Sequence, residues 1–200
     1  MEQILKNIKT LEKKLAGYDL RASYDLAAKI KYGIIRLGEE ISTVAPELTP
    51  EDGFFCKVDG YMDDGIACLE IGEELPHTKV ELSAAGHEYW LKLIYAAIGR
   101  LAEKSAVPHF DKAFVGIYTA MPHGYNNTKV WDASNRMINL VLNNLKGTFA
   151  ADDDIEHMAF AVVGGWSSEP KTIIFIGDFE TQSAEIMRKL VLVKAENTLC

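Results

Sequence analysis

Residues 134–163 are SNRMINLVLNNLKGTFAADDDIEHMAFAVV. The first half places its apolar side chains at helical spacing, and these are Met137, Ile138, Val141, Leu142 and Leu145. Gly147 is typical of a helix C-terminal cap, so the pattern predicts a helix over residues 134–146. Apolar residues then predict a strand over residues 155–163. A helix that leads directly into a strand indicates a fold that mixes α and β structure.

The segments on either side extend this pattern. A helix is predicted over residues 84–104, with Ser83 as its N-cap, followed by a strand over residues 112–120. After residue 163, a strand is predicted over residues 172–176 and a final helix over residues 181–194. The order from residue 79 is therefore α-β-α-β-β with a closing helix. We expect an α/β (α+β) fold with a mixed sheet.

The N-terminal part predicts two helices and a short hairpin. Helices are expected over residues 2–16 and 20–42, and strands over residues 54–58 and 66–71. The segment between these strands, residues 59–65, contains Gly and Asp and is predicted to be the hairpin loop. Residues 72–78 are polar and include a proline. We therefore divide the chain into an N-terminal extension, residues 1–78, and a domain of residues 79–200.

Composition excludes several classes of protein. The chain has 200 residues, of which 48% are apolar and 25% charged, as in globular proteins. No apolar run reaches the roughly 18 residues of a membrane-spanning helix, so we expect a cytoplasmic protein without a membrane partner. The three cysteines, Cys56, Cys68 and Cys200, have neither the number of a disulfide framework nor the spacing of a zinc site.

The net charge of −8 bears on the choice of partner. Proteins that bind nucleic acid normally carry a basic stripe, because contacts to phosphates dominate their affinity. No such stripe is visible in the sequence. The charge therefore argues against DNA as a ligand, although folding can gather scattered lysines onto one face.

Acidic residues stand at both ends of the helix predicted over residues 134–146. Asp132 precedes it, and Asp152, Asp153 and Asp154 follow it. Carboxylates are ligands that Mg²⁺ prefers, and two such ions promote phosphodiester hydrolysis. The helix spans roughly 20 Å, so the two groups meet only across a dimer interface or if the chain doubles back. The simpler interpretation is a helix cap at Asp132 and a solvated turn at the three aspartates.

The order of short motifs resembles the RusA-type Holliday-junction resolvases. The motifs are VELSAAGHEY at residues 80–89, a strand that ends in Met121-Pro122, DASN at residues 132–135, and DDI at residues 153–155. Their order and spacing match over about residues 79–178, half of the chain. The resemblance implies a RusA-like fold, and a homodimer that cuts branched DNA in recombination, repair or phage replication.

The resemblance also implies roles for individual residues. Asp132 corresponds to the family's first metal-binding aspartate, and Asn135 to its asparagine. Asp153 and Asp154 correspond to the acidic pair that completes the Mg²⁺ site. Asp132, Asp153 and Asp154 are therefore the expected catalytic and metal-binding residues, and Asn135 is expected to contact substrate.

The family's pattern is incomplete in this chain. Its second helix-start aspartate is Ser134 here, and its phosphate-binding lysine falls on Ile138. The loop that would contact DNA offers Lys129 and His123 as basic residues, and Arg136 is the candidate to replace the missing cation. Losing a carboxylate weakens Mg²⁺ binding, and isoleucine cannot stabilise the charge of a phosphoryl transition state.

Three interpretations remain open at this point. The first is a Mg²⁺-dependent endonuclease that acts on branched, Holliday-junction DNA, with a degenerate site. The second is a catalytically inactive RusA-like fold that acts as a protein-interaction or oligomerisation module. The third is an unrelated α/β domain whose default function would be a small-molecule pocket.

Overall fold

The computed structural model describes residues 1–17, 19–45, 56–76, 84–122 and 136–198. The chain divides into two compact units, Met1–Phe55 with Pro76–Trp90, and Cys56–Leu75 with Leu91–Cys200. The hairpin expected in the N-terminal extension thus belongs to the second unit, and the division predicted at residue 78 does not coincide with these boundaries. Among the described residues, no helix has both the length and the apolar character that a membrane span requires.

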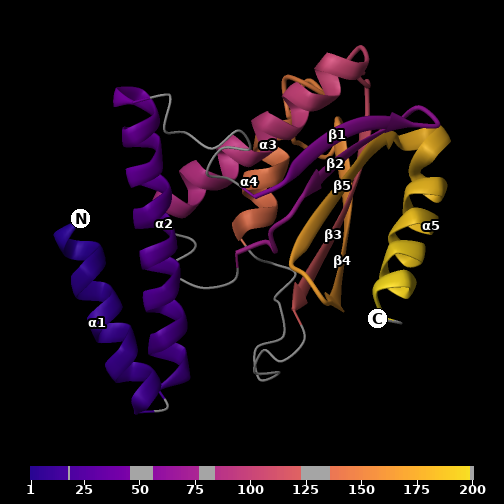
Figure 1. Cartoon of the computed structure of the whole chain (residues 1–200). Coiled ribbons are helices and arrows are strands. Elements are labelled where there is room, and N and C mark those ends of the chain that lie inside the picture. Colours follow the sequence, from indigo (N-terminus) through magenta and orange to yellow (C-terminus); the bar gives the residue numbers. More distant parts are fainter. Residues whose placement is uncertain (18, 46–55, 77–83, 123–135, 199–200) are drawn as a thin grey trace. The chain divides into compact units, whose positions relative to one another are not determined.

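The first unit contains two helices packed side by side, α1 (Glu2–Ala16) and α2 (Leu20–Val44), as Figure 1 shows. The Asp19 carboxylate caps α2 by accepting a hydrogen bond from the Ala22 amide at 3.2 Å, and it pairs with Lys14 at 3.0 Å. At Gly33 the helices come close, because a Cβ there would lie 3.2 Å from Cγ1 of Ile4. Both helices begin as predicted, and α2 ends two residues later than predicted.

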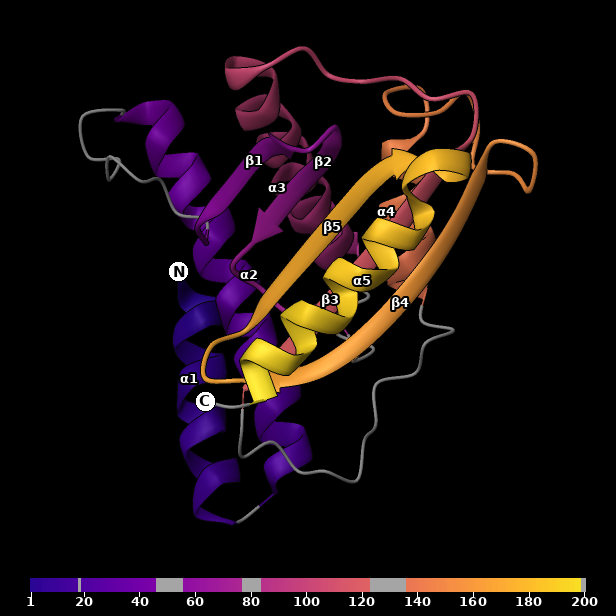
Figure 2. The same ribbon diagram turned by 90° about the vertical axis from the view of Figure 1, so that its right-hand side faces the viewer.

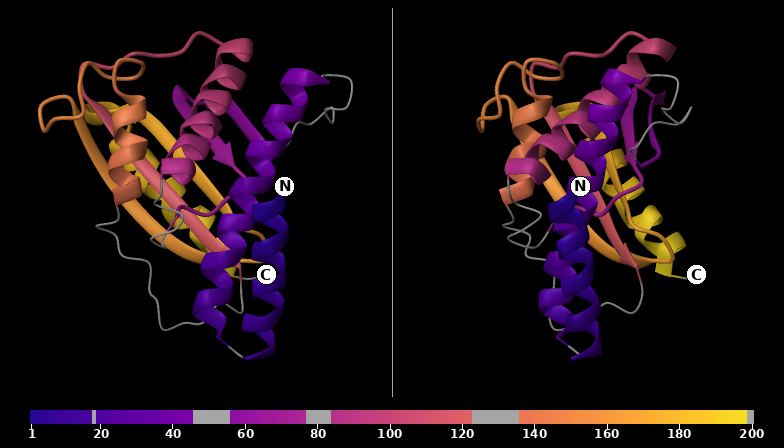
Figure 3. Two further views of the ribbon diagram at one scale, coloured as in Figure 1. Left: turned by 90° about the vertical axis from the view of Figure 1, so that its left-hand side faces the viewer. Right: turned by 60° about the vertical axis from the view of Figure 1, so that its left-hand side comes forward.

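The second unit is a five-stranded mixed sheet with helices on both faces. Its strands are β1 (Val58–Asp63), β2 (Ile66–Ile71), β3 (Ala113–Pro122), β4 (Met158–Ser167) and β5 (Lys171–Asp178), in the order β1-β2-β5-β3-β4. Only β3 and β4 pair in parallel. Helix α5 (Phe179–Thr198) lies across one face (Figure 2), while α4 (Arg136–Leu145) and the later part of α3 (Ala84–Lys104) lie on the other (Figure 3). The expected α+β fold with a mixed sheet is confirmed.

Alternation along the strands creates a core on each face of this sheet. Phe114 and Tyr118 of β3 point toward α5, where they pack with Ile186 and Leu190. The intervening Val115 and Ile117 have the opposite orientation and are fully buried, as are Val141 and Leu145 of α4. Because both faces are covered, β5 is a continuous apolar run and not a polar–apolar alternation.

The predicted hairpin loop at residues 59–65 is wrong. Strand β1 covers Val58–Asp63, and the turn is the two-residue pair Asp64-Gly65, with φ values of +50° and +80°. These positive values are those of a turn that favours Asp-Gly, because glycine adopts them without steric cost. The expected strand over residues 54–58 overlaps β1 only at Val58, and residues 54–55 lie outside the described part of the chain.

Strand β4 begins three residues later than predicted and ends four residues later. Residues 155–157 form a turn after α4, and residues 164–167, which lie beyond the predicted strand, contribute to β4. The Asp154 carboxylate accepts hydrogen bonds from the amides of Glu156 and His157, at 2.9 and 3.0 Å. These side-chain contacts satisfy the amides in a turn and compete with strand pairing.

Candidate functional site: the acidic turn

The acidic turn, residues 151–157, joins the end of α4 to the start of β4. Phe149, which is fully buried, anchors the segment that precedes it. The Phe149 amide donates to the Leu145 carbonyl at 2.9 Å, and the Phe149 carbonyl accepts from the Phe110 amide at 2.8 Å. Gly147 turns the chain with a φ of +75°, which favours glycine. The position of the acidic turn is therefore fixed from the core outward.

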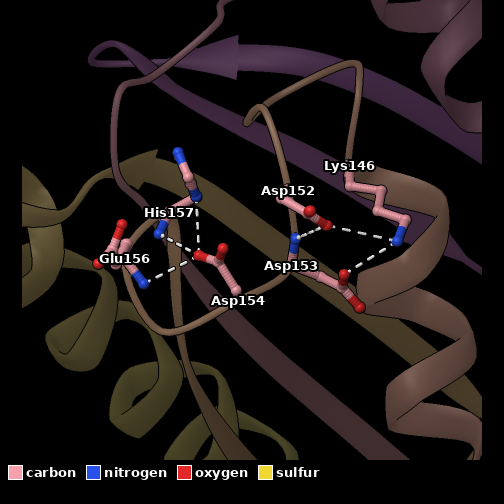
Figure 4. Close-up of polar contacts among 6 residues, drawn as sticks. All are labelled: Lys146, Asp152, Asp153, Asp154, Glu156 and His157. Carbon is pink, nitrogen blue, oxygen red and sulfur yellow. Dashed lines mark hydrogen bonds and ion pairs between the residues drawn. The ribbon is translucent and has the colours of Figure 1, made fainter.

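Asp152 and Asp153 both contact the Lys146 ammonium group, as Figure 4 shows. The Nζ–Oδ1 distances are 3.4 Å to Asp152 and 3.0 Å to Asp153. The Asp153 amide donates to the Asp152 carboxylate at 2.8 Å, and this bond, with further contacts from Asp153 and Lys146, lowers the pKa of Asp152. The hydrogen bond to Asp153 raises the pKa of Lys146. One ammonium group thus offsets part of the negative charge of these two carboxylates.

Asp154 has a different partner. Its Oδ1 lies 2.7 Å from Nδ1 of His157 and accepts the two backbone amides that form the turn. The hydrogen bond to His157 is the main cause that lowers the pKa of Asp154, and the same contact raises the pKa of His157 above 6.5. In Figure 4 the carboxylates of Asp152 and Asp153 turn toward Lys146, whereas that of Asp154 turns toward His157.

The fit to a metal ion follows from these contacts. Carboxylate oxygens have the right chemistry for Mg²⁺, but Asp153 and Asp154 are directed at different partners. Within the described ranges, no three His, Cys, Asp or Glu side chains are grouped so that they could hold an ion. In this conformation Asp153 and Asp154 do not point toward a common position, and the third predicted ligand, Asp132, lies outside the described residues.

The other predicted site residues are placed only in part. Asp132, Asn135 and Lys129 lie outside the described residues, as does Ser134. Arg136 is the first residue of α4, and its backbone alone is described. Helix α4 has ten residues, about 15 Å at 1.5 Å per residue, so Arg136 and the acidic turn belong to opposite ends of that helix.

The position to which the RusA resemblance would assign a phosphate-binding lysine is a core position in this chain. Ile138 is 2% exposed and lies on the same helix as the buried Met137 and Val141. A side chain there faces the protein interior, where a phosphate has no access. The isoleucine that stands at position 138, where the resemblance implies a lysine, is thus a core residue in the structure.

We expect the imidazole of His157 to titrate above 6.5 and Asp154→Asn to bring its pKa back toward that value. The stabilisation that protonated His157 gives the folded state is fully present below the ordinary pKa of histidine. It is lost as pH rises through the raised pKa of His157. The contribution of Asp154 is lost as pH falls through its lowered pKa. The Asp154–His157 ion pair therefore stabilises the folded state at pH values between the lowered pKa of Asp154 and the raised pKa of His157. A pH titration followed by histidine NMR measures the pKa of His157 in the parent and in Asp154→Asn. Equal values in the two proteins would contradict the contact.

Two partners in the acidic turn, Lys146 and His157, were not among the residues predicted from sequence. Lys146 follows the last turn of α4, where a cation is favoured by the helix dipole, and that is the signal that could have found it. Comparisons with protein-family models, curated proteins and solved structures gave no significant match to this chain.

Proposed function

We propose that this chain is a catalytically inactive module of RusA-like fold that acts through protein interaction. The observation that carries the proposal is the Lys146 ammonium group, which lies against both Asp152 and Asp153. A nuclease of this type would need Asp153 for its metal, whereas here a covalently attached cation lies against that carboxylate. The buried Ile138 supports the same conclusion, because it supplies no charge to a phosphoryl group.

The charge of the protein agrees with this proposal. A net charge of −8 repels a polyanion, and affinity for DNA depends mainly on the cations that replace its counterions. An interaction module has no such requirement. Its energy comes mainly from burying apolar side chains, and several large ones are exposed on α1 and α2.

A second candidate is the Mg²⁺-dependent endonuclease of RusA type, acting as a homodimer on branched DNA. One observation favours it: the side chain of Asp154, one of its proposed metal ligands, is 51% exposed, so solvent cations reach it. In this proposal Asp132, Asp153 and Asp154 hold the metal, and Asn135, Arg136 and Lys129 contact the DNA. It requires Asp153 to leave Lys146.

Divalent cations distinguish the two proposals. We expect the melting temperature of the parent to change by less than about 1 °C between metal-free buffer and millimolar Mg²⁺ or Mn²⁺. An ion bound at 100 times its dissociation constant would add about 2.7 kcal/mol, or roughly 5–10 °C for a chain of this size. A four-way DNA junction incubated with the parent and either metal should stay intact.

The controls for this experiment are Asp153→Asn and Asp111→Asn, the latter an exposed aspartate outside the acidic turn. We expect parent and both variants to respond to metal alike. A metal-induced shift that Asp153→Asn abolishes and Asp111→Asn retains, or metal-dependent cleavage of the junction, would replace the interaction proposal by the nuclease.

A further inference from the structure

Helix α2 carries a heptad repeat that the packing of its own unit leaves partly open to solvent. Residues 27, 30, 34, 37, 41 and 44 follow the alternating spacing of three and four that defines positions a and d of a coiled coil, and all six are apolar: Ala27, Ile30, Ile34, Leu37, Ile41 and Val44. Ile34, Ile41 and Val44 are 50%, 37% and 85% exposed. A seam of this kind normally contacts another helix.

Helix α1 has a matching stripe. Leu5, Ile8 and Leu15 are at the same heptad spacing and are 53%, 37% and 52% exposed. Position 12, which completes the repeat, is Glu12. The inward residues of α1 are different ones, with Ile4 contacting α2 at Gly33.

The two stripes lie on the same side of the helical hairpin. We take the contact between Ile4 and Gly33 as the reference direction on each helix and advance about 100° per residue. Measured about each helix axis, the α1 stripe lies about 20–100° from Ile4 and the α2 stripe about 20–120° from Gly33. Both rotations are in the direction in which the helix turns from its N-terminus to its C-terminus. Because the helices run antiparallel, equal rotations about the two axes point to the same side. The stripes therefore form one continuous surface, here called the hairpin face.

The size of the hairpin face suits a protein partner. Two helices about 10 Å wide, with 15 and 25 residues, present about 600 Å² on one side. Two such faces bury about 1,200 Å², the lower end of the range for stable protein interfaces. Large contiguous apolar patches on a monomer often mark a binding surface, and apolar residues occupy most repeat positions on this side.

Building on the proposed interaction role, we infer that the hairpin face binds a second copy of this chain and forms a four-helix bundle. The same surface on both partners makes a closed twofold interface, the commonest arrangement in homo-oligomers. A continuous a/d seam on α2, with Ile34 and Ile41 at a and Leu37 at d, suits packing between helices of this kind. The buried area of about 1,200 Å² lies at the lower end of the range for stable interfaces.

Glu12 gives this interface a distinctive property. It occupies the one charged position of the repeat on α1, between Ile8 and Leu15, and is exposed. In the bundle its carboxylate would move toward the apolar seam, which costs free energy. Replacing Glu12 with leucine should therefore lower the dissociation constant of the dimer. If the chain were monomeric, the same change would leave its mass in solution unchanged.

The test is the mass of the full chain in solution, measured by light scattering over a concentration series. We expect the parent to have twice the 22.2 kDa of one chain. Ile34→Glu places a charge in the seam of each copy and should raise the dissociation constant about 100-fold or more. Glu12→Leu should lower it. Because Ile34 is half exposed, the variant should keep its helical circular dichroism.

Val191→Glu is the matched control, because Val191 is 62% exposed on α5 and lies outside the hairpin face. It should leave the dissociation constant unchanged. A monomeric parent, or a dimer that Ile34→Glu and Val191→Glu weaken equally, would overturn the inference. These results depend on the mass of the protein alone. The response to divalent cations, which tests the proposed function, is measured separately and can fail or succeed independently.

Discussion

Phe149→Ala is expected to lower the free energy of unfolding by about 3–5 kcal/mol. The Phe149 ring is fully buried next to the end of α4, and its backbone bonds to Leu145 and Phe110 hold the segment that leads into the acidic turn. Truncation loses the transfer free energy of the ring and leaves a cavity that the surrounding helix and sheet cannot fill. Chemical denaturation of the parent and variant measures the difference.

Phe160→Ala is the matched control for this prediction. Phe160 is 51% exposed on β4, so the same change in side-chain volume should cost less than about 1 kcal/mol. Equal losses for the two variants would mean that Phe149 does not anchor the segment as described. A large loss for Phe149→Ala alone would show that the acidic turn depends on the core beneath it.

Gly60→Ala is expected to destabilise the second unit by about 3 kcal/mol or more. A Cβ at Gly60 would lie 2.1 Å from the Ala97 carbonyl oxygen and 2.8 Å from the Leu101 amide nitrogen. Both obstacles are backbone atoms of α3, so no side chain can rotate to make room. Strand β1 must move away from α3, and the contact between Lys104 and Asp59 would be strained with it. Thermal and denaturant unfolding measure the loss.

Gly99→Ala, in the helix α3 that Gly60 contacts, provides the comparison. A Cβ at Gly99 meets nothing within 4 Å, and alanine has the higher helix propensity, so this variant should be more stable by up to about 1 kcal/mol. The opposite signs of the two substitutions are the expected signature. If Gly60→Ala unfolds like the parent, β1 and α3 are not in the contact described here.

Gly60 also explains why the β-hairpin was misplaced from sequence. The chain contains Asp59-Gly60 and Asp64-Gly65, and each pair is a typical turn. Of these two pairs, the structure uses Asp64-Gly65 as the turn. Gly60 is a glycine because α3 lies against it, and the α3 residues that it meets, Ala97 and Leu101, are more than thirty residues away in the sequence. Local composition cannot distinguish a glycine that turns the chain from one that admits a neighbour.

The acidic turn shows the same limit in the candidate site. The sequence located three aspartates between a helix and a strand, and it allowed either a metal site or a solvated turn. The structure pairs two of them with Lys146 and one with His157. The choice depends on how the chain turns after Gly147, which the buried Phe149 controls.

By itself, the sequence determined the type and approximate extent of most helices and strands, and it contains the heptad repeat of α2. These features depend on periodicity over a few turns or residues, which any short segment carries. Only the tertiary structure decided which Asp-Gly pair turns the chain, which cation faces each aspartate, and which apolar stripe of α2 packs and which stays exposed. Gly60 and the α3 backbone, like α1 and the stripe of α2 that it covers, are distant in the sequence and become neighbours only when the chain folds. Lys146 and His157 lie within seven residues of their aspartates, but the turn that brings them together depends on the buried Phe149.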